Sequence, residues 1–431
     1  MKKSLLFPFL FCSAVIFGQT PDDSLTSRLD DYFTSLTNLK QFNGNVIVSK
    51  NGNMLLDKSF NLTGENDSLK VDRESKFIIA SVSKVFIKFG ILKLAEMKKL
   101  QLSDKINRYI PDFPDAGKIS IEHLLYHQSG LPRELTRKEE FDSLSLSKII
   151  ELAKEEKLQF EPGLQTLYSN VGYFLLHYII DITSDSGYLN FIQDEIFRKM
   201  NLTNTLEFNS AATIPKFAYG FDNEDGKIMA TSKKNINKFE TGNYLSTAGD
   251  LYRFSQQILS GNVLNPSLTL HLFGKDSVLT QAGGRPGYRA YFYMNLKTRV
   301  TFIFVCNYTG IPFQETTSGI LSILDGKPFQ IPGKIHRVEI ELPGELLKQY
   351  AGTYALEADQ TMTVTLQLIG NRLFNVDTNG EKTVLHADSE TTFFEKPDTN
   401  DGYEFSYNPE TKRYDLTITD TGLKLKTKRV E

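Results

Sequence analysis

The stretch FIIASVSKVFIKFGILKLAEM, residues 77–97, decides how the first part of this chain folds. From Val85 to Leu100 only a few lysines and one glutamate interrupt the apolar residues. Such a wide apolar face predicts a helix that is central in its domain and largely buried. Ser81 and Lys84 stand at the start of this run, so a hydroxyl and an amine lie where the helix begins.

The length and composition of the chain limit its class. It has 431 residues, more than one ordinary hydrophobic core holds, so we expect two domains. Hydrophobic residues make up 40% and charged residues 23%, as in soluble globular proteins. The formal net charge is −3. A general nucleic-acid binder needs a basic surface to neutralise phosphates, so this composition argues against that class.

The first 18 residues have the pattern of a secretory signal. Lys2 and Lys3 precede an apolar run over residues 5–17, and small and polar residues follow. The run is shorter than the roughly 20 apolar residues that a membrane-spanning helix needs. A buried first helix is the alternative, which the lack of a periodic polar face disfavours. We expect an exported protein, periplasmic or extracellular, with no stable transmembrane segment after cleavage.

The order of elements predicts an α+β fold. Residues 42–60 contain two strand-like runs around Asn51-Gly52, a pair that tolerates the positive φ angles of a tight hairpin. Helical segments dominate residues 120–270, and strands return over residues 289–307. This order predicts a central antiparallel sheet, flanked by helices in an α/β sandwich, in which both ends of the domain pair. We place this domain at residues 25–325.

A second, smaller domain follows a change in composition. Residues 326–346 are rich in Pro and Gly, and we interpret residues 326–339 as a linker. Residues 340–431 then show strand patterns and predict a small antiparallel β domain. Apolar residues alternate with polar ones at Met362, Val364, Leu366 and Leu368, and again at Tyr414, Leu416 and Ile418. Gly370-Asn371 offers a turn between two strands.

Ser81 and Lys84 have the spacing of a catalytic pair. Positions i and i+3 share one face of a helix, so Lys84 lies one turn below Ser81. A serine hydroxyl is a weak nucleophile until a base takes its proton, and a lysine can be that base if burial lowers its pKa. The alternative is a helix-capping serine with a solvated lysine. Ser-x-x-Lys alone favours the alternative, since many helices contain it by chance.

Further segments favour the catalytic interpretation of Ser81 and Lys84 over the capping one. The blocks are ASVSK, ISIEHLLYHQSGLP, EPGLQTLYSNVGY, GNYLSTAGDLYRF and GGRPGY, in this order over residues 30–325. With them the chain resembles the serine β-lactamase and penicillin-binding-protein superfamily, and within it the class C-like serine hydrolases, which include esterases and D-amino-acid peptidases. The C-terminal β domain resembles the small lipocalin-like domains that often follow such hydrolases.

The resemblance implies a role for each matching residue. Ser81 is then the acylated nucleophile, and Lys84 shares in its activation. Tyr168 is the general base, held partly ionised by Lys84, because a free tyrosine has a pKa of roughly 10. Asn170 hydrogen-bonds Lys84 and the substrate. Backbone N–H groups of Ser81 and Gly284 form the oxyanion hole, and the glycines at 283 and 284 let the substrate lie against the strand edge.

The third motif departs from the family pattern. Where such enzymes carry Lys-Thr-Gly or His-x-Gly, this chain has Gln281-Ala282-Gly283. A cation at that position often binds a substrate carboxylate, whereas Gln281 brings no charge. An ester or amide without a free carboxylate therefore fits more easily than a β-lactam or a DD-carboxypeptidase substrate. Arg285 is close enough in sequence to substitute, or its side chain faces solvent; both interpretations stay open.

Other reactive residues have structural explanations. His123 and His127 have i, i+4 spacing but lack the glutamate of a zinc-protease motif, so we expect structural histidines at the rim of the site. Cys306 lies in an apolar run, which predicts a buried thiol. Ser246 or Thr247 is expected to cap a helix. Aromatics of the β domain either line a ligand cavity or, as we prefer, form its core: Tyr354, Phe374, Phe393 and Phe394.

The sequence therefore predicts a serine hydrolase without metal or cofactor, acting on a small-molecule or peptide substrate. A β-lactamase or DD-carboxypeptidase is the first alternative. The second is a binding or sensor protein that keeps the fold without catalysis, which Gln281 motivates and the joint presence of Ser81, Lys84 and Tyr168 opposes. The substrate, the role of the β domain and the oligomeric state stay open.

Overall fold

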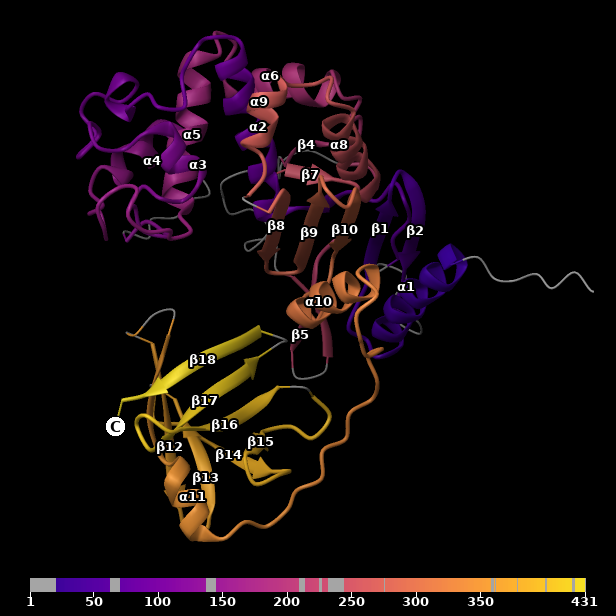
Figure 1. Ribbon diagram of the computed structural model, residues 1–431, viewed down its shortest axis with the longest axis vertical. Coiled ribbons are helices and arrows are strands. Elements are labelled where there is room, and N and C mark those ends of the chain that lie inside the picture. Colours follow the sequence, from indigo (N-terminus) through magenta and orange to yellow (C-terminus); the bar gives the residue numbers. More distant parts are fainter. Residues whose placement is uncertain are drawn as a thin grey trace, which may run out of the picture.

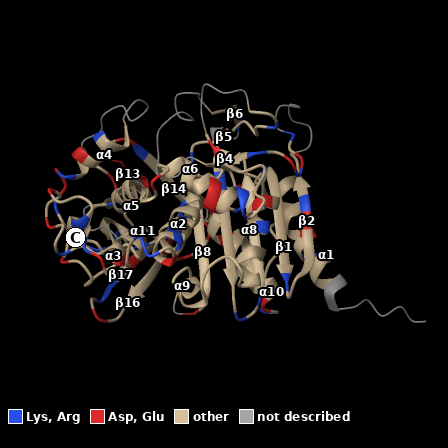
Figure 2. Ribbon diagram, turned by 90° about the horizontal axis from the view of Figure 1, so that it is seen from above, with Lys and Arg blue, Asp and Glu red and all other residues tan. Residues whose placement is uncertain are grey.

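The computed structural model describes residues 21–62, 70–136, 145–208, 214–224, 227–231, 244–274, 276–357, 360, 362–377, 379–399, 401–420 and 423–430. The predicted signal over residues 1–18 lies outside these ranges. Within them, no helix is long and apolar enough to cross a membrane. Figure 2 shows Lys and Arg interspersed with Asp and Glu around the helices and loops.

The first part of the chain is organised by a five-stranded antiparallel sheet with the order β2-β1-β10-β9-β8 (Figure 1). Its strands are β1 (Gly44–Lys50), β2 (Asn53–Phe60), β8 (Val278–Arg285), β9 (Tyr288–Asn295) and β10 (Val300–Cys306). β1 pairs with β10 along its whole length. The expected pairing of the two ends of this domain is therefore confirmed.

Local sequence explains the hairpin between β1 and β2. Asn51 and Gly52 have φ angles of 54° and 82°. Both angles are left-handed, as a tight hairpin turn requires, and Asn and Gly adopt them at the lowest cost. The turn therefore sets the register in which β2 returns along β1.

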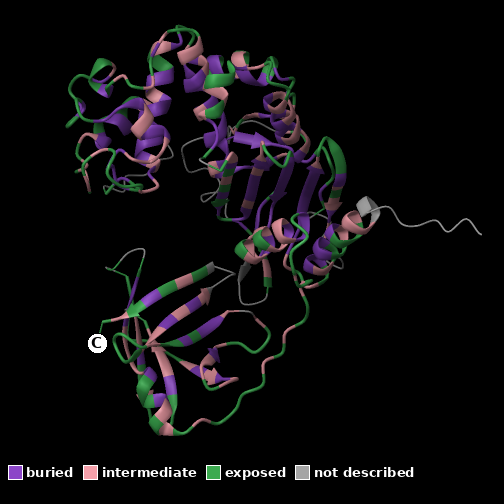
Figure 3. Ribbon diagram, viewed as in Figure 1, coloured by how far each residue is buried: buried purple, intermediate pink, exposed green. Residues whose placement is uncertain are grey.

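Helices cover both faces of the sheet. The core on one face includes residues of α2 (Lys84–Glu96) and α8 (Ala248–Ser260), and that on the other includes residues of α1 (Pro21–Asn38) and α10 (Phe313–Leu324). Successive side chains of a strand point to opposite faces. Ile47 thus joins the first core, whereas Val46 and Val48 join the second. Because both faces are covered, the central strands β1 and β10 are buried along nearly their whole length (Figure 3), whereas the edge strands β2 and β8 also carry exposed residues.

A mainly helical region lies between β2 and β8 in the chain. Besides α2 and α8 it holds α3 (Ile121–Leu125), α4 (Leu146–Ala153), α5 (Asn170–Thr183), α6 (Tyr188–Ile192) and α9 (Pro266–Leu270). Its short strands are β3 (Phe77–Ile78), β4 (Leu206–Glu207), β5 (Phe221–Glu224), β6 (Lys227–Ala230) and β7 (Tyr244–Ser246). They form the small sheet β3-β7-β4 and the hairpin β5-β6, which a helical prediction for residues 120–270 did not include.

The ends of these helices follow capping rules. The side chain of Ser169 accepts a hydrogen bond from Gly172 N and caps α5, and that of Thr247 accepts one from Asp250 N and caps α8. Of the two expected caps, Thr247 is thus the one used. α2 ends at Glu96 rather than near Leu100, because Lys98 adopts a left-handed φ of 60°.

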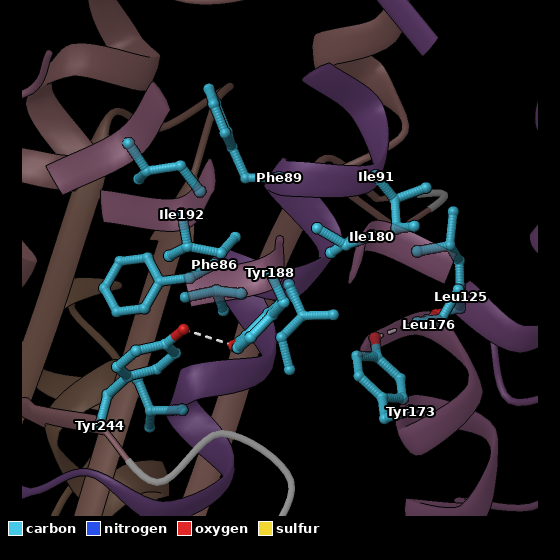
Figure 4. Close-up of a cluster of buried hydrophobic side chains, with 14 of the residues drawn as sticks. Phe86, Phe89, Ile91, Leu125, Tyr173, Leu176, Ile180, Tyr188, Ile192 and Tyr244 are labelled. Carbon is cyan, nitrogen blue, oxygen red and sulfur yellow. Dashed lines mark hydrogen bonds between the residues drawn. The ribbon is translucent and has the colours of Figure 1, made fainter. Parts of the chain in front are cut away.

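The predicted burial of α2 is confirmed, because nine of its 13 residues are buried. Figure 4 shows Phe86 of this helix beside Tyr188 and Tyr244, whose hydroxyl groups hydrogen-bond to each other. The rings of Phe86 and Tyr244 meet edge to face, with 5.9 Å between centroids. Each side of α2 therefore meets packed side chains, which leaves its first turn little freedom to move.

The C-terminal part is a closed barrel of eight strands in sequential order. Its strands are β11 (Gly352–Leu356), β12 (Thr363–Ile369), β13 (Arg372–Val376), β14 (Lys382–Ala387), β15 (Thr392–Phe394), β16 (Gly402–Asn408), β17 (Arg413–Asp420) and β18 (Leu423–Arg429). The short helix α11 (Gly344–Tyr350) precedes them. Its Tyr350 stacks on Phe405, with 4.2 Å between ring centroids. Tyr354 and Phe393 join this core, whereas Phe374 is half-buried.

The segment between the two parts follows the barrel for several residues. Arg337 N donates to Pro397 O at 2.8 Å, and Ile340 N donates to Ala387 O at 2.7 Å. The guanidinium of Arg337 lies 5.0 Å from the ring of Phe394, so this aromatic faces the connecting segment. Direct contact between the two parts involves α10 and β18, where Lys424 N donates to Gln314 Oε1 at 3.1 Å.

The close approach of β1 and β10 gives a test of the fold. A Cβ atom added at Gly44 would lie 2.1 Å from Val305 O, a backbone atom that cannot rotate away. We expect Gly44→Ala to lower the free energy of unfolding by about 1–3 kcal/mol, as overpacking does. Gly333→Ala is the control, because nothing lies within 4 Å of its added Cβ, and it should change stability by less than about 0.5 kcal/mol. Urea unfolding measures both; equal stabilities would contradict the pairing.

Candidate active site

Ser81 and Lys84 are brought together by a tight turn. Ser81 lies in the 3₁₀ turn η2 (Ala80–Ser83), which continues into α2 at Lys84. Side chains at i and i+3 eclipse in a 3₁₀ turn. Lys84 Nζ therefore donates to Ser81 Oγ at 3.0 Å. Ala80, just before the serine, has a φ of 45°, a strained conformation of the kind found where a turn presents a functional side chain.

Tyr168 completes this cluster from a distant part of the chain. It lies two residues before the start of α5, and its hydroxyl donates to Ser81 Oγ at 2.9 Å. Ser81 Oγ thus accepts hydrogen bonds from both Lys84 and Tyr168. Two donors on one oxygen favour negative charge there, which an activated nucleophile needs.

The three groups differ in exposure. Lys84 is 1% exposed, and its Nζ lies 5.3 Å and 5.5 Å from the ring centroids of Tyr168 and Tyr173. Ser81 and Tyr168 are only half-buried. A substrate carbonyl can therefore reach the hydroxyl of Ser81, while the amine beneath it stays shielded from water.

Burial raises the pKa of Tyr168 above its ordinary value of 10.0. The hydrogen bond to Ser81, the charge of Arg133 and a hydrogen bond to Gln281 oppose this rise, and Glu134 adds to it. The phenol is therefore protonated at neutral pH in the resting site. This differs from the expectation of a partly ionised tyrosine, because the cost of desolvating a phenolate outweighs the nearby cations.

Arg133 is a site residue that the sequence analysis missed. Its guanidinium lies 5.2 Å from the ring centroid of Tyr168, and its side chain is 68% exposed. It directly follows the block ISIEHLLYHQSGLP, and this adjacency was the available signal. The next residue, Glu134, accepts a hydrogen bond from Asn170 Nδ2 at 2.6 Å. The site thus has an exposed cation and an exposed carboxylate at its rim.

The predicted residues of the third motif lie on β8, next to the serine turn. Gln281 lies close enough to Tyr168 to lower the pKa of the phenol, and its Nε2 donates to Ala282 O at 2.9 Å. Gly283 approaches the turn so closely that an added Cβ would lie 2.3 Å from Ile79 O. Gly284 is exposed, and its added Cβ would point instead toward Arg289. Gly283 therefore lets the edge strand lie against the turn that carries Ser81.

Arg285 is buried at the end of β8. Its side chain is 4% exposed, so the interpretation that it faces solvent is wrong. Its charge lowers the pKa of Tyr288, which places it beside that residue at the far end of β8. Two basic groups lie near the Tyr168 ring: Lys84 Nζ at 5.3 Å and the guanidinium of Arg133, from another loop, at 5.2 Å from its centroid.

The remaining candidates have structural contacts. His123 closes a capping box with Ser120 at the start of α3. Cys306 is buried, its thiol contacts Tyr308 O at 3.0 Å, and burial raises its pKa to about 11. His127, in contrast, stacks on Tyr168 with 4.5 Å between ring centroids, a contact that its sequence position did not reveal. Within the described ranges, no three His, Cys, Asp or Glu residues gather as a metal site.

The chain is similar to known proteins over most of its length. The family model described as Beta-lactamase matches residues 30–321. Penicillin-binding protein 4* of Bacillus subtilis strain 168 is 27% identical over 417 residues, which are 85% of this chain and 91% of that protein.

Solved structures extend the comparison to the fold. The octameric penicillin-binding protein homologue from Pyrococcus abyssi has a TM-score of 0.63 at 17% identity, covering 95% of this chain and 100% of that chain. The D-amino acid amidase from Ochrobactrum anthropi SV3 has a TM-score of 0.60 at 18% identity, covering 70% of this chain and 99% of that chain. At these identities the likeness shows the fold.

The two glycines of β8 give a matched test of the site. Gly283→Ala must push β8 away from the serine turn, so we expect the reaction of Ser81 with a fluorophosphonate to slow by about 100-fold. Gly284→Ala places its Cβ 3.6 Å from Arg289, an ordinary contact, and should react within about threefold of wild type. A time course by intact-mass spectrometry measures both rates. Equal rates in the two variants would mean that β8 does not shape the site.

Proposed function

The chain belongs to the beta-lactamase family of serine hydrolases, and from this we propose that it hydrolyses an ester or amide through an acyl-enzyme on Ser81. The observation that carries the proposal is the cluster around Ser81 Oγ, with Lys84 Nζ at 3.0 Å and the Tyr168 hydroxyl at 2.9 Å. A nucleophile within hydrogen-bond reach of two proton-transfer groups is the arrangement that acyl transfer needs.

Acylation begins with attack of Ser81 Oγ on the substrate carbonyl carbon. In this proposal Lys84 reacts as the unprotonated amine: as the new C–O bond forms, the hydroxyl proton passes to Lys84 Nζ and the carbonyl oxygen becomes an oxyanion. Backbone N–H groups of Ser81 and Gly284 stabilise that charge in this proposal. When the tetrahedral intermediate collapses, the Lys84–Tyr168 pair returns a proton to the leaving alcohol or amine. Because the resting phenol is protonated, Tyr168 is ready to donate at this step.

Deacylation repeats these steps with water. The Lys84–Tyr168 pair takes a proton from water, the resulting hydroxide attacks the acyl carbon, and Ser81 Oγ leaves as the pair returns the proton to it. The product is a carboxylic acid, and the enzyme regains its starting protonation state. The same two groups therefore serve both halves of the reaction.

The neutral Gln281 supports a substrate without a free carboxylate on the leaving side, such as a simple ester or a D-amino-acid amide. In this proposal Gln281 and Asn170 bind the substrate by hydrogen bonds, with Gly283 and Gly284 against its backbone. Arg285 is buried beside Tyr288 and contributes less directly. No charge is then required at the position where related motifs carry lysine or histidine.

The cellular location and the domain boundaries are also part of this proposal. The apolar run over residues 5–17 behind two lysines supports export to the periplasm or beyond the cell. Residues 25–325 form the hydrolase domain and residues 340–431 the barrel domain. The linker is proposed at residues 326–339, although from Arg337 onward the chain already contacts the barrel.

Mutation of the cluster tests the mechanism. We expect Ser81→Ala to form no fluorophosphonate adduct and to lose Ser81-dependent hydrolysis of a p-nitrophenyl ester. Lys84→Ala and Tyr168→Phe should each lose about 10²–10⁴ in kcat/KM. Ser83→Ala is the matched control, because Ser83 lies in the same turn but its Oγ accepts from Tyr244 N at 3.4 Å. Hydrolysis of the ester by Ser81→Ala at the wild-type rate would contradict the proposal. Reversible ligand binding by the wild-type protein without any adduct on Ser81 would favour a binding protein.

A second candidate is reaction with penicillins, which Arg133 favours because it places an exposed cation at Tyr168. The name of the Bacillus relative points the same way for that protein. We expect the fluorophosphonate to react at least about tenfold faster than benzylpenicillin, since the third motif lacks its cation. Intact-mass rates on wild type, Arg133→Gln and the distant control Arg108→Gln measure this. A fast penicillin adduct that only Arg133→Gln slows would establish the second candidate.

A further inference from the structure

We propose that His127 is a positioning residue for Tyr168: its backbone, its ring nitrogen and its ring face hold the segment Leu167–Ser169 so that the phenol reaches Ser81. This inference rests on the proposed function, in which Tyr168 transfers the proton. His127 lies in the connection after α3, far in sequence from the segment it contacts. It does not touch Ser81 in any contact described above, so it would act only through Tyr168.

His127 accepts two hydrogen bonds, one from the residue before Tyr168 and one from the residue after it. Its backbone oxygen accepts from Leu167 N at 2.8 Å, on one side of Tyr168. Its ring nitrogen Nδ1 accepts from Ser169 N at 3.1 Å, on the other side. Both neighbours of Tyr168 are thus tied to one residue. The backbone of the tyrosine is thereby fixed before α5 begins, at a point where the chain has no helical hydrogen bonds of its own.

The imidazole ring adds a third contact. It lies against Tyr168 with 4.5 Å between centroids and against Tyr173 with 5.0 Å, at interplanar angles of 32° and 30°. Tyr173 belongs to α5 and is 3% exposed. The imidazole is therefore clamped between a fixed ring of the core and the half-buried ring of Tyr168. Contacts between aromatic rings have preferred orientations, so they fix the direction of the Tyr168 ring as well as burying apolar surface.

The backbone of His127 is strained in a way that serves these contacts. Its φ is 57°, a left-handed conformation that few non-glycine residues adopt, although His, Asn and Asp adopt it more often than the others. The following turn also supports the segment before Tyr168, since Gly163 N donates to Gln128 O at 2.9 Å and Gln159 N donates to Gly130 O at 2.7 Å. A residue keeps an unfavourable backbone conformation only where surrounding contacts stabilise it, and the contacts around His127 place its ring against Tyr168.

The acceptor role requires an unprotonated Nδ1, and the surroundings of His127 favour that state. Burial, together with the charges of Lys84 and Lys88 on α2, lowers the pKa of His127 to about 4. The other titratable groups packed on it are Tyr168 and Tyr173. Lys88 is itself half-buried, desolvation lowers its pKa to about 8, and its Nζ donates to Leu272 O at 3.3 Å. At neutral pH the imidazole is thus neutral, and its Nδ1 lone pair is free for Ser169 N–H.

Two variants separate positioning from simple packing. His127→Asn keeps an acceptor, because Asn Oδ1 occupies nearly the place of Nδ1, and asparagine tolerates the left-handed φ. His127→Gly also tolerates this φ but removes acceptor and ring together. We expect His127→Gly to lower kcat for a p-nitrophenyl ester by about 100-fold with KM changed less than about threefold, as for a misplaced catalytic group. His127→Asn should keep kcat within about tenfold of wild type.

The matched control is His177→Asn. His177 is also a buried histidine on a tyrosine, with 4.1 Å between its ring and that of Tyr188, and its pKa is lowered to about 3. We expect this variant to lose thermal stability to an extent similar to His127→Gly but to keep kcat. If His177→Asn lowers kcat as much as His127→Gly, general loosening of the core explains both, and the positioning role is overturned.

Hydrogen exchange gives a readout that does not depend on catalysis. Peptides that contain residues 165–170 should exchange faster in His127→Gly than in wild type and His127→Asn at pH 7. In wild type the protection of these peptides, which is the intrinsic exchange rate at the same pH divided by their observed rate, should fall once the pH drops below about 4, where Nδ1 takes up a proton. Equal exchange in the three proteins, or equal kcat in wild type and His127→Gly, overturns the inference. Loss of Ser81-dependent turnover in wild type itself instead removes the proposed function.

Discussion

The burial of α2 is the constraint on which the rest of the site depends. The helix packs between the sheet and the surrounding helices, so the turn before it cannot move without opening the core. That turn carries Ser81, and the first residue of the helix is Lys84. Burying an amine without a partner costs free energy. Here Lys84 Nζ donates to Ser81 Oγ and lies near the rings of Tyr168 and Tyr173, which offsets that cost. The packed core around α2 thus fixes the positions of two polar residues, Ser81 and Lys84.

Desolvation sets the charge state of the site in opposite directions for different groups. It raises the pKa of Tyr168 and lowers that of His127 and Lys88, because burial always penalises the charged form. The resting site therefore contains a protonated phenol and a neutral imidazole. Both states match their hydrogen bonds, since the phenol donates to Ser81 and the imidazole accepts from Ser169 N. Protonation and geometry are consistent with each other without any bound metal or cofactor being invoked for them.

The barrel is stabilised in a different way from the sheet. Its eight strands close on themselves, so each of them pairs with a neighbour on both sides within the part of the barrel that the structure describes. The interior holds aromatic side chains, with Tyr350 from α11 stacked on Phe405 and edge-on to Phe393. These contacts agree with the expectation of a packed core rather than a ligand cavity for Tyr354 and Phe393. Phe394, in contrast, is covered from outside by Arg337, which ties the connecting segment to the barrel.

The sequence by itself determined the features that depend on local pattern: the Asn51-Gly52 hairpin, the buried helix after Ser81, the alternating strands of the barrel, and the ordered motifs that place Tyr168 with Ser81 and Lys84. Only the tertiary structure decided that Arg133 lies on Tyr168, that Arg285 is buried, and that His127 holds the segment around the tyrosine. The physical reason is that periodicity and turn chemistry act over a few neighbouring residues, whereas these contacts join loops whose relative positions are set by the packed core between them.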